Sequence, residues 1–187
     1  MKYMQIRPTD IANGPGIRVT LFVSGCKLNC LGCFNKEAQN FNAGYDFNQD
    51  TIDKIIKYMD KPFIKGLTIL GGDSLEPKNQ KDTLNLIKQV RLKFKDSKDI
   101  WVWTGRKYEE LIEGNNNLKN YSYVKNITDE FLKNIDILVD GPFIKNLNRK
   151  GLIYMGSINQ KIIDVPKTLK NNNSIILSKY DYLENRE

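Results

Sequence analysis

Three cysteines stand close together in the sequence, at Cys26, Cys30 and Cys33, with three and then two residues between them. The chain of 187 residues has no other cysteine and no histidine. An odd number of cysteines at this spacing is not the pattern of a disulfide framework. Thiolates also bind zinc and iron, so the pattern indicates a metal centre.

The missing histidine narrows the chemistry of that centre. A closed zinc site usually takes four protein ligands, so here it would need a carboxylate or a second chain. A four-iron cluster takes one thiolate per iron, and three thiolates would leave one iron open to a substrate or cofactor. Ser-His-Asp catalysis, Cys-His catalysis and the usual zinc hydrolase sites are excluded.

Short apolar runs alternate with helical patterns along the chain. We predict strands over Ile17–Val23, Gly66–Leu70, Ile100–Trp103 and Ile135–Val139. We predict helices over Thr51–Met59, with Asp50 as N-cap, and over Asp82–Phe94, with short helical turns at Glu109–Ile112 and at Thr128–Lys133, the latter capped by Thr128. Such alternation favours a mainly parallel sheet with right-handed crossovers.

Small, polar or cysteine residues follow each predicted strand. They are Ser24–Cys26, Gly71–Asp73, Thr104–Arg106 and Asp140–Pro142. Ligands of open α/β sheets bind at the carboxyl ends of the strands. The four segments are therefore expected to meet at one site.

The cysteine spacing matches the signature of radical S-adenosylmethionine enzymes. Several flanking segments together resemble the anaerobic ribonucleoside-triphosphate reductase-activating proteins, within the glycyl-radical-enzyme activases. They are Asn13–Arg18, Leu21–Cys26, Leu31–Lys36, Gly71–Asp73, Ile100–Gly105, Asp136–Phe143 and Gly156–Asp164. The resemblance runs from about Thr9 to Val165.

The resemblance implies an oxidoreductase with a 4Fe-4S cluster and S-adenosyl-L-methionine as cofactors. In this family the amino and carboxylate groups of S-adenosylmethionine bind the open iron. One electron then cleaves a sulfur–carbon bond, which gives methionine and a 5′-deoxyadenosyl radical. The implied substrate is a glycine of the anaerobic ribonucleotide reductase catalytic subunit, and the implied electron donor is a protein such as a flavodoxin.

The resemblance also assigns residues. Cys26, Cys30 and Cys33 would hold the cluster. The expected cofactor contacts are Gly32, Cys33, Phe34, Gly71, Gly72, Asp73, Thr104, Asp140, Ser157 and Asn159, with Gln160 as a further candidate. Glycine amides would donate to the methionyl carboxylate, and Asp73 would accept from its ammonium group. Phe34 would either offer an aromatic face or fill the core.

Three residues depart from the family pattern. Ser74 stands where proline is usual, Arg106 where an aromatic is common, and Lys161 where arginine is usual. Lysine cannot make a bidentate contact. Arg106 is either a local variation or a surface charge that faces a partner. Both tryptophans, Trp101 and Trp103, are expected in the core.

We expect one α/β domain built as an incomplete (β/α) barrel whose open side faces a partner, as the resemblance implies. The expected domain covers residues 1–165, and residues 166–187 form a tail that packs as an edge strand or docks a partner. The asparagine runs at Asn115–Asn117 and Asn171–Asn173 are expected in loops.

Composition excludes several classes of protein. The net charge is +7, but lysines alternate with acids, which favours a solvated surface over a nucleic-acid site. The sequence has no apolar run long enough to span a membrane and no secretory signal pattern at its start. A cytoplasmic location is expected.

Two alternatives remain open at this point. The first is a radical enzyme that acts on a small molecule, as 7-carboxy-7-deazaguanine synthases do. The second is a non-catalytic zinc- or iron-binding module, for which steep salt-dependent binding to nucleic acid would be evidence.

Overall fold

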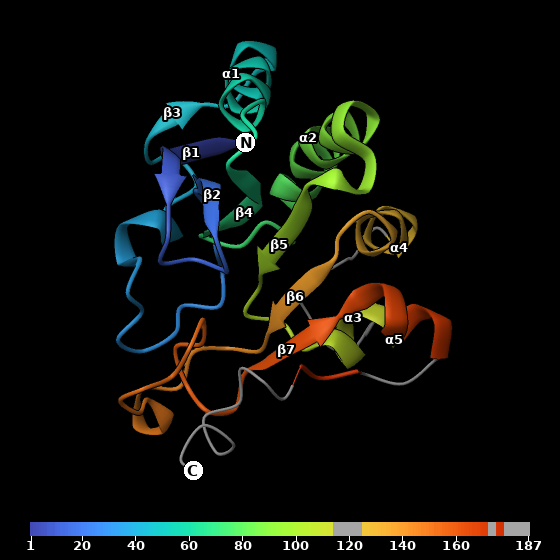
Figure 1. The fold of residues 1–187 in the computed structure, drawn as a ribbon. Coiled ribbons are helices and arrows are strands. Elements are labelled where there is room, and N and C mark those ends of the chain that lie inside the picture. The colour runs from blue at the N-terminus through green and yellow to red at the C-terminus, as the bar shows by residue number, and fades with distance from the viewer. Residues whose placement is uncertain (114–124, 172–174, 178–187) are drawn as a thin grey trace.

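The computed structural model describes residues 1–113, 125–171 and 175–177, and these form one α/β unit around a seven-stranded sheet (Figure 1). The strands are β1 (Lys2–Asp10), β2 (Ile17–Val23), β3 (Tyr45–Asp46), β4 (Ile64–Gly71), β5 (Asp99–Trp103), β6 (Ile137–Asp140) and β7 (Lys161–Asp164). The helices are α1 (Gln49–Met59), α2 (Pro77–Phe94), α3 (Tyr108–Glu113), α4 (Lys125–Lys133) and α5 (Val165–Asn171), with short 3₁₀ turns at Lys36–Gln39, Lys95–Ser97 and Lys145–Leu147.

The sheet is mixed, and its strand order is β3-β1-β2-β4-β5-β6-β7. The four central strands, from β2 to β6, pair in parallel, whereas β1 with β2, β1 with β3, and β6 with β7 pair antiparallel. The prediction of a mainly parallel sheet was therefore wrong at both edges. The link from β1 to β2 is too short for a crossover helix, so these neighbours must run antiparallel.

The sheet is open, because its two end strands, β3 and β7, do not pair with each other. The structure therefore confirms a single α/β sheet and does not confirm a barrel. In Figure 1 the helices gather on one side of the sheet, and long loops leave the other side. These loops include the cysteine segment and the connection from β6 to β7.

The two faces of the central strands carry different side chains. One face is aliphatic and joins the helices in the main core, as Val19, Leu21 and Val23 of β2 show. The opposite face of β2 carries Arg18 and Phe22, and β5 adds its two tryptophans to that side. Alternation along a strand sends successive side chains to opposite faces. The helices cover the aliphatic face, whereas Trp101, Ile137, Val139 and Ile162 form a smaller apolar cluster on the opposite face.

The predicted elements agree with the observed ones to different extents. The predicted strand Ile17–Val23 coincides with β2, and the other three predicted strands overlap β4, β5 and β6. The helix α1 begins earlier than expected, because Asn48 rather than Asp50 is its N-cap. Thr128 lies inside α4 and does not cap it. The strands β1, β3 and β7 and the helix α5 were not predicted.

The tail partly joins the sheet. The Asp164 amide donates to the Ile175 carbonyl at 2.9 Å, and the Leu177 amide donates to the Ile162 carbonyl at 2.8 Å. Residues 175–177 therefore lie along β7, as the edge-strand alternative predicted. Asn115–Asn117 lie outside the described residues; of the second asparagine run only Asn171 is described, and it ends α5 rather than lying in a loop.

Within the described parts of the chain, the helices are too short or too polar to cross a membrane.

Candidate functional site

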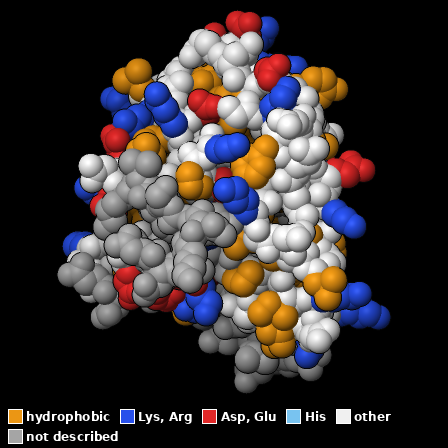
Figure 2. Space-filling view, turned by 180° about the vertical axis from the view of Figure 1, so that it is seen from behind, with side chains coloured by type: hydrophobic (Ala, Val, Ile, Leu, Met, Phe, Trp, Pro, Cys, Tyr) orange, Lys and Arg blue, Asp and Glu red, His pale blue; other side chains and the backbone are white. Residues whose placement is uncertain are grey.

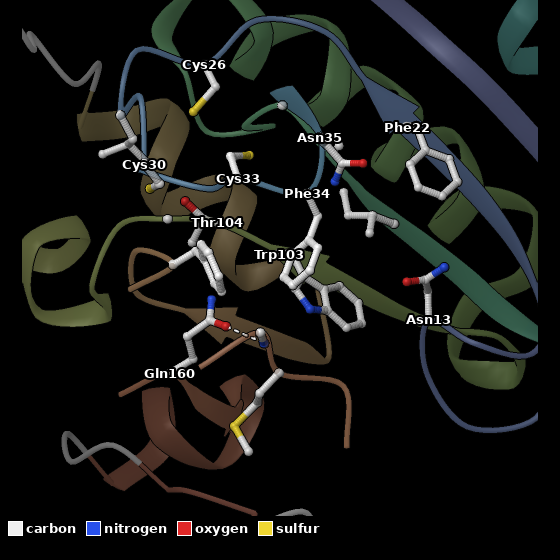
Figure 3. Close-up of a pocket in the computed structure, with 18 of the residues that line it drawn as sticks. Asn13, Phe22, Cys26, Cys30, Cys33, Phe34, Asn35, Trp103, Thr104 and Gln160 are labelled. Atoms are coloured by element: carbon white, nitrogen blue, oxygen red, sulfur yellow. Dashed lines mark hydrogen bonds between the residues drawn. The ribbon is translucent and has the colours of Figure 1, made fainter. Parts of the chain in front are cut away.

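A pocket of about 550 Å³ opens at the carboxyl ends of the parallel strands. Side chains from the cysteine loop, from β5 and from the β6–β7 connection surround it in Figure 3. All three cysteines line it, together with Gly71, Gly72, Thr104, Gly105 and Gly141 at the strand ends. The four strand-end segments therefore meet, as the sheet rule predicted.

Figure 3 shows the three cysteines near one another on the wall of the pocket, on the same side as Thr104. All three cysteines are free and half-buried. Among the described residues, no three cysteine, aspartate or glutamate side chains are placed to hold a single metal ion together. A zinc ion would hold each sulfur ligand about 2.3 Å from the metal, so that all the sulfur atoms would surround one point. A cluster spreads them further apart because each thiolate binds a different iron.

Burial opposes ionisation of two of these thiols. The pKa of Cys26 is raised to about 12, first by burial and then by the negative charge of Asp73. Burial also raises the pKa of Cys30. Metal ligation requires thiolates, so a bound metal must displace these protons. The metal-free protein consequently holds Cys26 as a neutral thiol at neutral pH.

The cysteine loop is fixed at its base by the end of β4. The Gly72 amide donates to the Val23 carbonyl at 2.7 Å, and the Asp73 amide donates to the Gly25 carbonyl at 2.9 Å. The buried Asn79 side chain adds a bond to the Ser24 carbonyl at 2.8 Å. Three hydrogen bonds thus set the direction in which the chain leaves β2 and reaches Cys26.

The two glycines at the end of β4, Gly71 and Gly72, have no room for a side chain. A Cβ on Gly72 would lie 2.6 Å from the Gly25 carbonyl oxygen, and one on Gly71 would lie 2.7 Å from the Val23 carbonyl oxygen. Gly71 also has a φ of +111°, which favours glycine. The close approach joins β4 to the cysteine loop. Because the amides of Gly72 and Asp73 are used in that contact, they do not point at a ligand.

The Asp73 side chain is fully buried and belongs to an internal ion cluster. Its carboxylate accepts from the Leu75 amide at 2.9 Å and from the Thr104 hydroxyl at 3.0 Å, and it pairs with the Arg106 guanidinium at 3.3 Å. Arg106 also donates to Glu76 at 2.9 Å. Asp73 is therefore occupied by protein partners, and Arg106 is not a surface charge.

Glu76 connects this ion cluster to the cysteine loop. Its carboxylate accepts from the Lys27 amide at 2.9 Å, next to the first cysteine. Burial raises the pKa of both Glu76 and Asp73, while the positive charge of Arg106 acts in the opposite direction. One guanidinium thus faces two buried carboxylates, and the three side chains connect the ends of β4 and β5 with the cysteine loop.

The predicted cofactor contacts divide into two groups. Cys33, Phe34, Gly71, Gly72 and Thr104 line the pocket, whereas Gly32, Asp73, Asp140, Ser157 and Asn159 are not among its lining residues. Phe34 is exposed and packs against Phe143, with ring centroids 4.9 Å apart. It therefore offers an aromatic face to the pocket rather than filling the core. Gly32 has a φ of +74° and lies beside the Lys145 side chain.

Three of the predicted contacts form hydrogen bonds with backbone groups near the pocket instead of lining it. They are Asp140, Ser157 and Asn159. Asp140 accepts from the Tyr108 amide at 2.8 Å and from the Lys161 amide at 3.2 Å. Burial raises the pKa of Asp140. Ser157 accepts from the Ile144 amide at 3.1 Å, and Asn159 donates to the Pro142 carbonyl at 2.8 Å.

Gln160, the further candidate, lines the pocket. Its side-chain oxygen accepts from the Gly156 amide at 2.7 Å, and its side-chain nitrogen donates to the Gly141 carbonyl at 2.8 Å. Lys161, which stands where arginine is usual in the family, pairs with Glu109 at 3.1 Å. A lysine at this position therefore has its own partner in this chain.

Sequence reasoning missed part of the pocket wall. Trp103 lines the pocket and donates from its indole to the Tyr154 carbonyl at 3.0 Å, whereas Trp101 is buried as predicted. Asn13 and Asn35 also line the pocket (Figure 3). The position of Trp103 as the last residue of its strand was the available signal, because strand ends border the site.

Comparisons with known proteins identify the family of the chain. The family described as a 4Fe-4S single cluster domain matches residues 12–163. The anaerobic ribonucleoside-triphosphate reductase-activating protein of Enterobacteria phage T4 is 40% identical over 162 residues, which cover 87% of this chain and 93% of that protein. The protein of the same name from Escherichia coli K12 is 41% identical over 164 residues, which cover 87% of this chain and 97% of that protein. The chain belongs to this family of reductase-activating proteins.

A further relative and the family model both support the membership of this chain in the family. The protein of that name from Vibrio cholerae is 40% identical over 164 residues, which cover 87% of this chain and 97% of that protein. The matched 4Fe-4S domain includes the cysteine loop and every pocket-lining segment from Asn13 to Gln160. The matched family domain therefore spans the segments that form most of the pocket.

Proposed function

We propose that this protein cleaves S-adenosylmethionine reductively and generates the glycyl radical of an anaerobic ribonucleotide reductase. A 4Fe-4S cluster held by Cys26, Cys30 and Cys33 supplies one electron to the sulfonium when bound. The sulfur–carbon bond breaks to give methionine and a 5′-deoxyadenosyl radical. That radical takes one hydrogen atom from a glycine Cα, which leaves 5′-deoxyadenosine and a glycyl radical on the reductase.

The observation that carries the proposal is the arrangement of the thiols. Three free cysteines from one loop line the same pocket, and the chain has no fourth cysteine and no histidine. Three thiolates suit a four-iron cluster, which they would hold with one iron left without a protein ligand. A closed zinc site would need a fourth ligand, and among residues 1–113, 125–171 and 175–177 no three side chains of the usual ligand types are placed around one ion position.

Residues of the pocket wall would position S-adenosylmethionine. Gly71 and Gly72 border the pocket with backbone alone, and their carbonyl groups are suited to accept from the ammonium group of the methionyl end. Phe34, Phe143 and Trp103 provide aromatic faces for an adenine ring and exclude water from the radical. This division of tasks replaces the expected contact with the Asp73 carboxylate, which the protein itself occupies.

The open sheet suits a substrate that is a segment of another protein. The face without helices leaves room for a loop to approach the pocket, as an incomplete (β/α) barrel would. We further propose a cytoplasmic protein with a radical domain over residues 1–165 and a tail over residues 166–187. A flavodoxin-like protein is the proposed electron donor.

The test is an anaerobic assay. Protein reconstituted with iron and sulfide is reduced, mixed with S-adenosylmethionine, and assayed for 5′-deoxyadenosine and for a glycyl radical on added reductase. We expect both products from the wild-type protein. Cys30→Ala should abolish both while the apoprotein keeps its circular dichroism spectrum. Native cleavage by this variant would overturn the cluster assignment.

Two further outcomes separate the alternatives. Product formation from a small substrate without any reductase would favour an enzyme of the 7-carboxy-7-deazaguanine synthase type. Absence of 5′-deoxyadenosine from protein with a full four-iron cluster would favour a non-catalytic metal-binding module.

A further inference from the structure

Three chain segments form the rim of the pocket, and we call residues 11–16, 26–36 and 143–160 the rim. Each segment contributes pocket-lining residues, among them Asn13, Cys33 and Tyr154. The second and third segments touch: the Phe34 and Phe143 rings pack together, and the Lys145 side chain lies beside Gly32. The rim is therefore one surface around one opening.

The rim concentrates exposed apolar side chains. Its six exposed large hydrophobics are Ile11, Leu31, Phe34, Ile144, Ile153 and Ile158, half of the twelve found in the described part of the chain. Leu31 is 82% exposed, although it stands between two cysteines. Large apolar side chains left exposed on the segments that line a pocket are candidates for a binding surface.

The charges of the rim all have one sign. Its five charged residues are Lys27, Lys36, Lys145, Arg149 and Lys150; within its bounds there is no aspartate or glutamate, and the exposed Glu37 directly follows the second segment. The chain as a whole carries 22 acidic residues beside 29 basic ones, so the rim departs from the mixed pattern elsewhere. Figure 2 shows hydrophobic and basic side chains side by side at the lower right, the part of the molecule with the cysteine loop and the β6–β7 connection in Figure 1.

We propose that the rim docks an acidic surface of the reductase from which an apolar loop enters the pocket. This inference rests on the proposed function. The occupant follows from two properties of the rim: its basic charge complements acidic side chains, and its exposed apolar residues belong to the segments that line the pocket that the target glycine must reach. The positive rim accelerates encounter, and the apolar residues hold the complex once formed.

The charge pattern favours a protein over a nucleic acid. The basic residues of the rim alternate with exposed aliphatic side chains such as Leu31, Ile144 and Ile158. A nucleic-acid groove instead combines a basic track with aromatic side chains that stack on bases. Aliphatic side chains between the charges match a protein interface, whose centre is apolar and whose edge is polar.

The test uses the reconstituted protein and makes two separate measurements: the affinity for the reductase catalytic subunit and the formation of 5′-deoxyadenosine. Leu31→Ser and Lys150→Glu each remove one rim property outside the pocket lining. We expect each to weaken the affinity for the reductase catalytic subunit about tenfold, and Lys150→Glu to reduce the salt dependence of binding as well. Formation of 5′-deoxyadenosine without reductase should stay within about twofold of wild type.

Matched controls lie on the helices at the opposite end of the molecule. Leu92 of α2 is also 82% exposed, and Lys57 of α1 is exposed. Leu92→Ser and Lys57→Glu should bind the reductase like wild type. Equal affinities for the rim variants and these controls would overturn the docking surface. Salt-dependent capture of a single-stranded oligonucleotide by wild type, lost in Lys150→Glu with reductase binding intact, would also overturn it.

The two proposals fail in different ways. If wild-type protein makes no 5′-deoxyadenosine, the proposed function fails whatever the rim variants bind. If it makes 5′-deoxyadenosine and a glycyl radical, and the rim variants keep native affinity and native radical yield, only the docking surface fails.

Discussion

The Arg106 guanidinium donates to the Glu76 carboxylate at 2.9 Å, and both side chains are almost fully buried behind the cysteine loop. Glu76 in turn accepts from the Lys27 amide, one residue after Cys26. An arginine at this position therefore acts through a carboxylate on the backbone of the cysteine loop. This explains how the chain accommodates a charge where the family often has an aromatic residue.

Removal of this arginine should destabilise the protein strongly. Arg106→Met leaves the carboxylates of Asp73 and Glu76 buried without a cation, and breaking a buried ion pair in this way costs about 3–5 kcal/mol. Urea unfolding monitored by circular dichroism measures the loss. Arg106→Lys keeps the charge and should lose less.

A second variant distinguishes charge from packing at this site. Adding Asp73→Asn and Glu76→Gln to Arg106→Met removes the uncompensated charges, so part of the lost stability should return. A triple variant no more stable than Arg106→Met would show that the arginine acts by packing alone.

The contact between β4 and the cysteine loop gives a steric prediction. Gly72→Ala places a Cβ 2.6 Å from the Gly25 carbonyl oxygen, so the loop base must shift and iron content after reconstitution should fall several-fold. Gly105→Ala is the control, because its Cβ meets the flexible end of Leu28 at 2.3 Å, which rotates away. Iron and sulfide analysis compares the two. Equal iron content would show that the glycine is not needed for the loop.

The candidate metal centre could be proposed from sequence because its residues are local. Cys26, Cys30 and Cys33 lie in one loop, so their spacing alone indicates the site. The strand β2 was predicted to the residue because its β-branched and aromatic run is bounded by breaks. The strand β1 was missed because it is half-exposed and contains Pro8 at an irregularity in its pairing.

The ion cluster could not be predicted, because its members are far apart in sequence. Asp73 stood in a segment that resembles a cofactor-binding pattern, and only the fold shows that Arg106 occupies its carboxylate. The sequence pattern predicted that both residues follow strand ends, but it did not predict which way their side chains point. For the same reason Trp103 was assigned to the core although it borders the pocket.

The start of α1 offers a direct comparison between sequence and structure. The Asn48 side chain accepts from the Thr51 amide at 3.0 Å, whereas Asp50 lies within the helix. Asn48→Ala should lower the free energy of unfolding by about 1 kcal/mol. Asp50→Ala should cost less, because it loses only a charge near the helix N-terminus. Thermal unfolding of the two variants measures both losses of stability. A larger loss of stability for Asp50→Ala would show that Asp50 is the N-cap, as predicted from sequence.

The raised pKa of Cys26 predicts how the cluster-free protein responds to pH. Burial favours the neutral thiol, so the folded protein holds this proton more tightly than the unfolded chain, in which the pKa is near 9.0. The stability from this difference is present below about pH 9 and is lost as pH rises toward about 12. The thiolate reacts with iodoacetamide, and its fraction should rise about tenfold per pH unit between pH 7 and 10. Mass spectrometry of the Cys26 peptide measures the rate, with the same peptide in urea as control. A plateau near pH 9 in the folded protein would contradict the burial of this thiol.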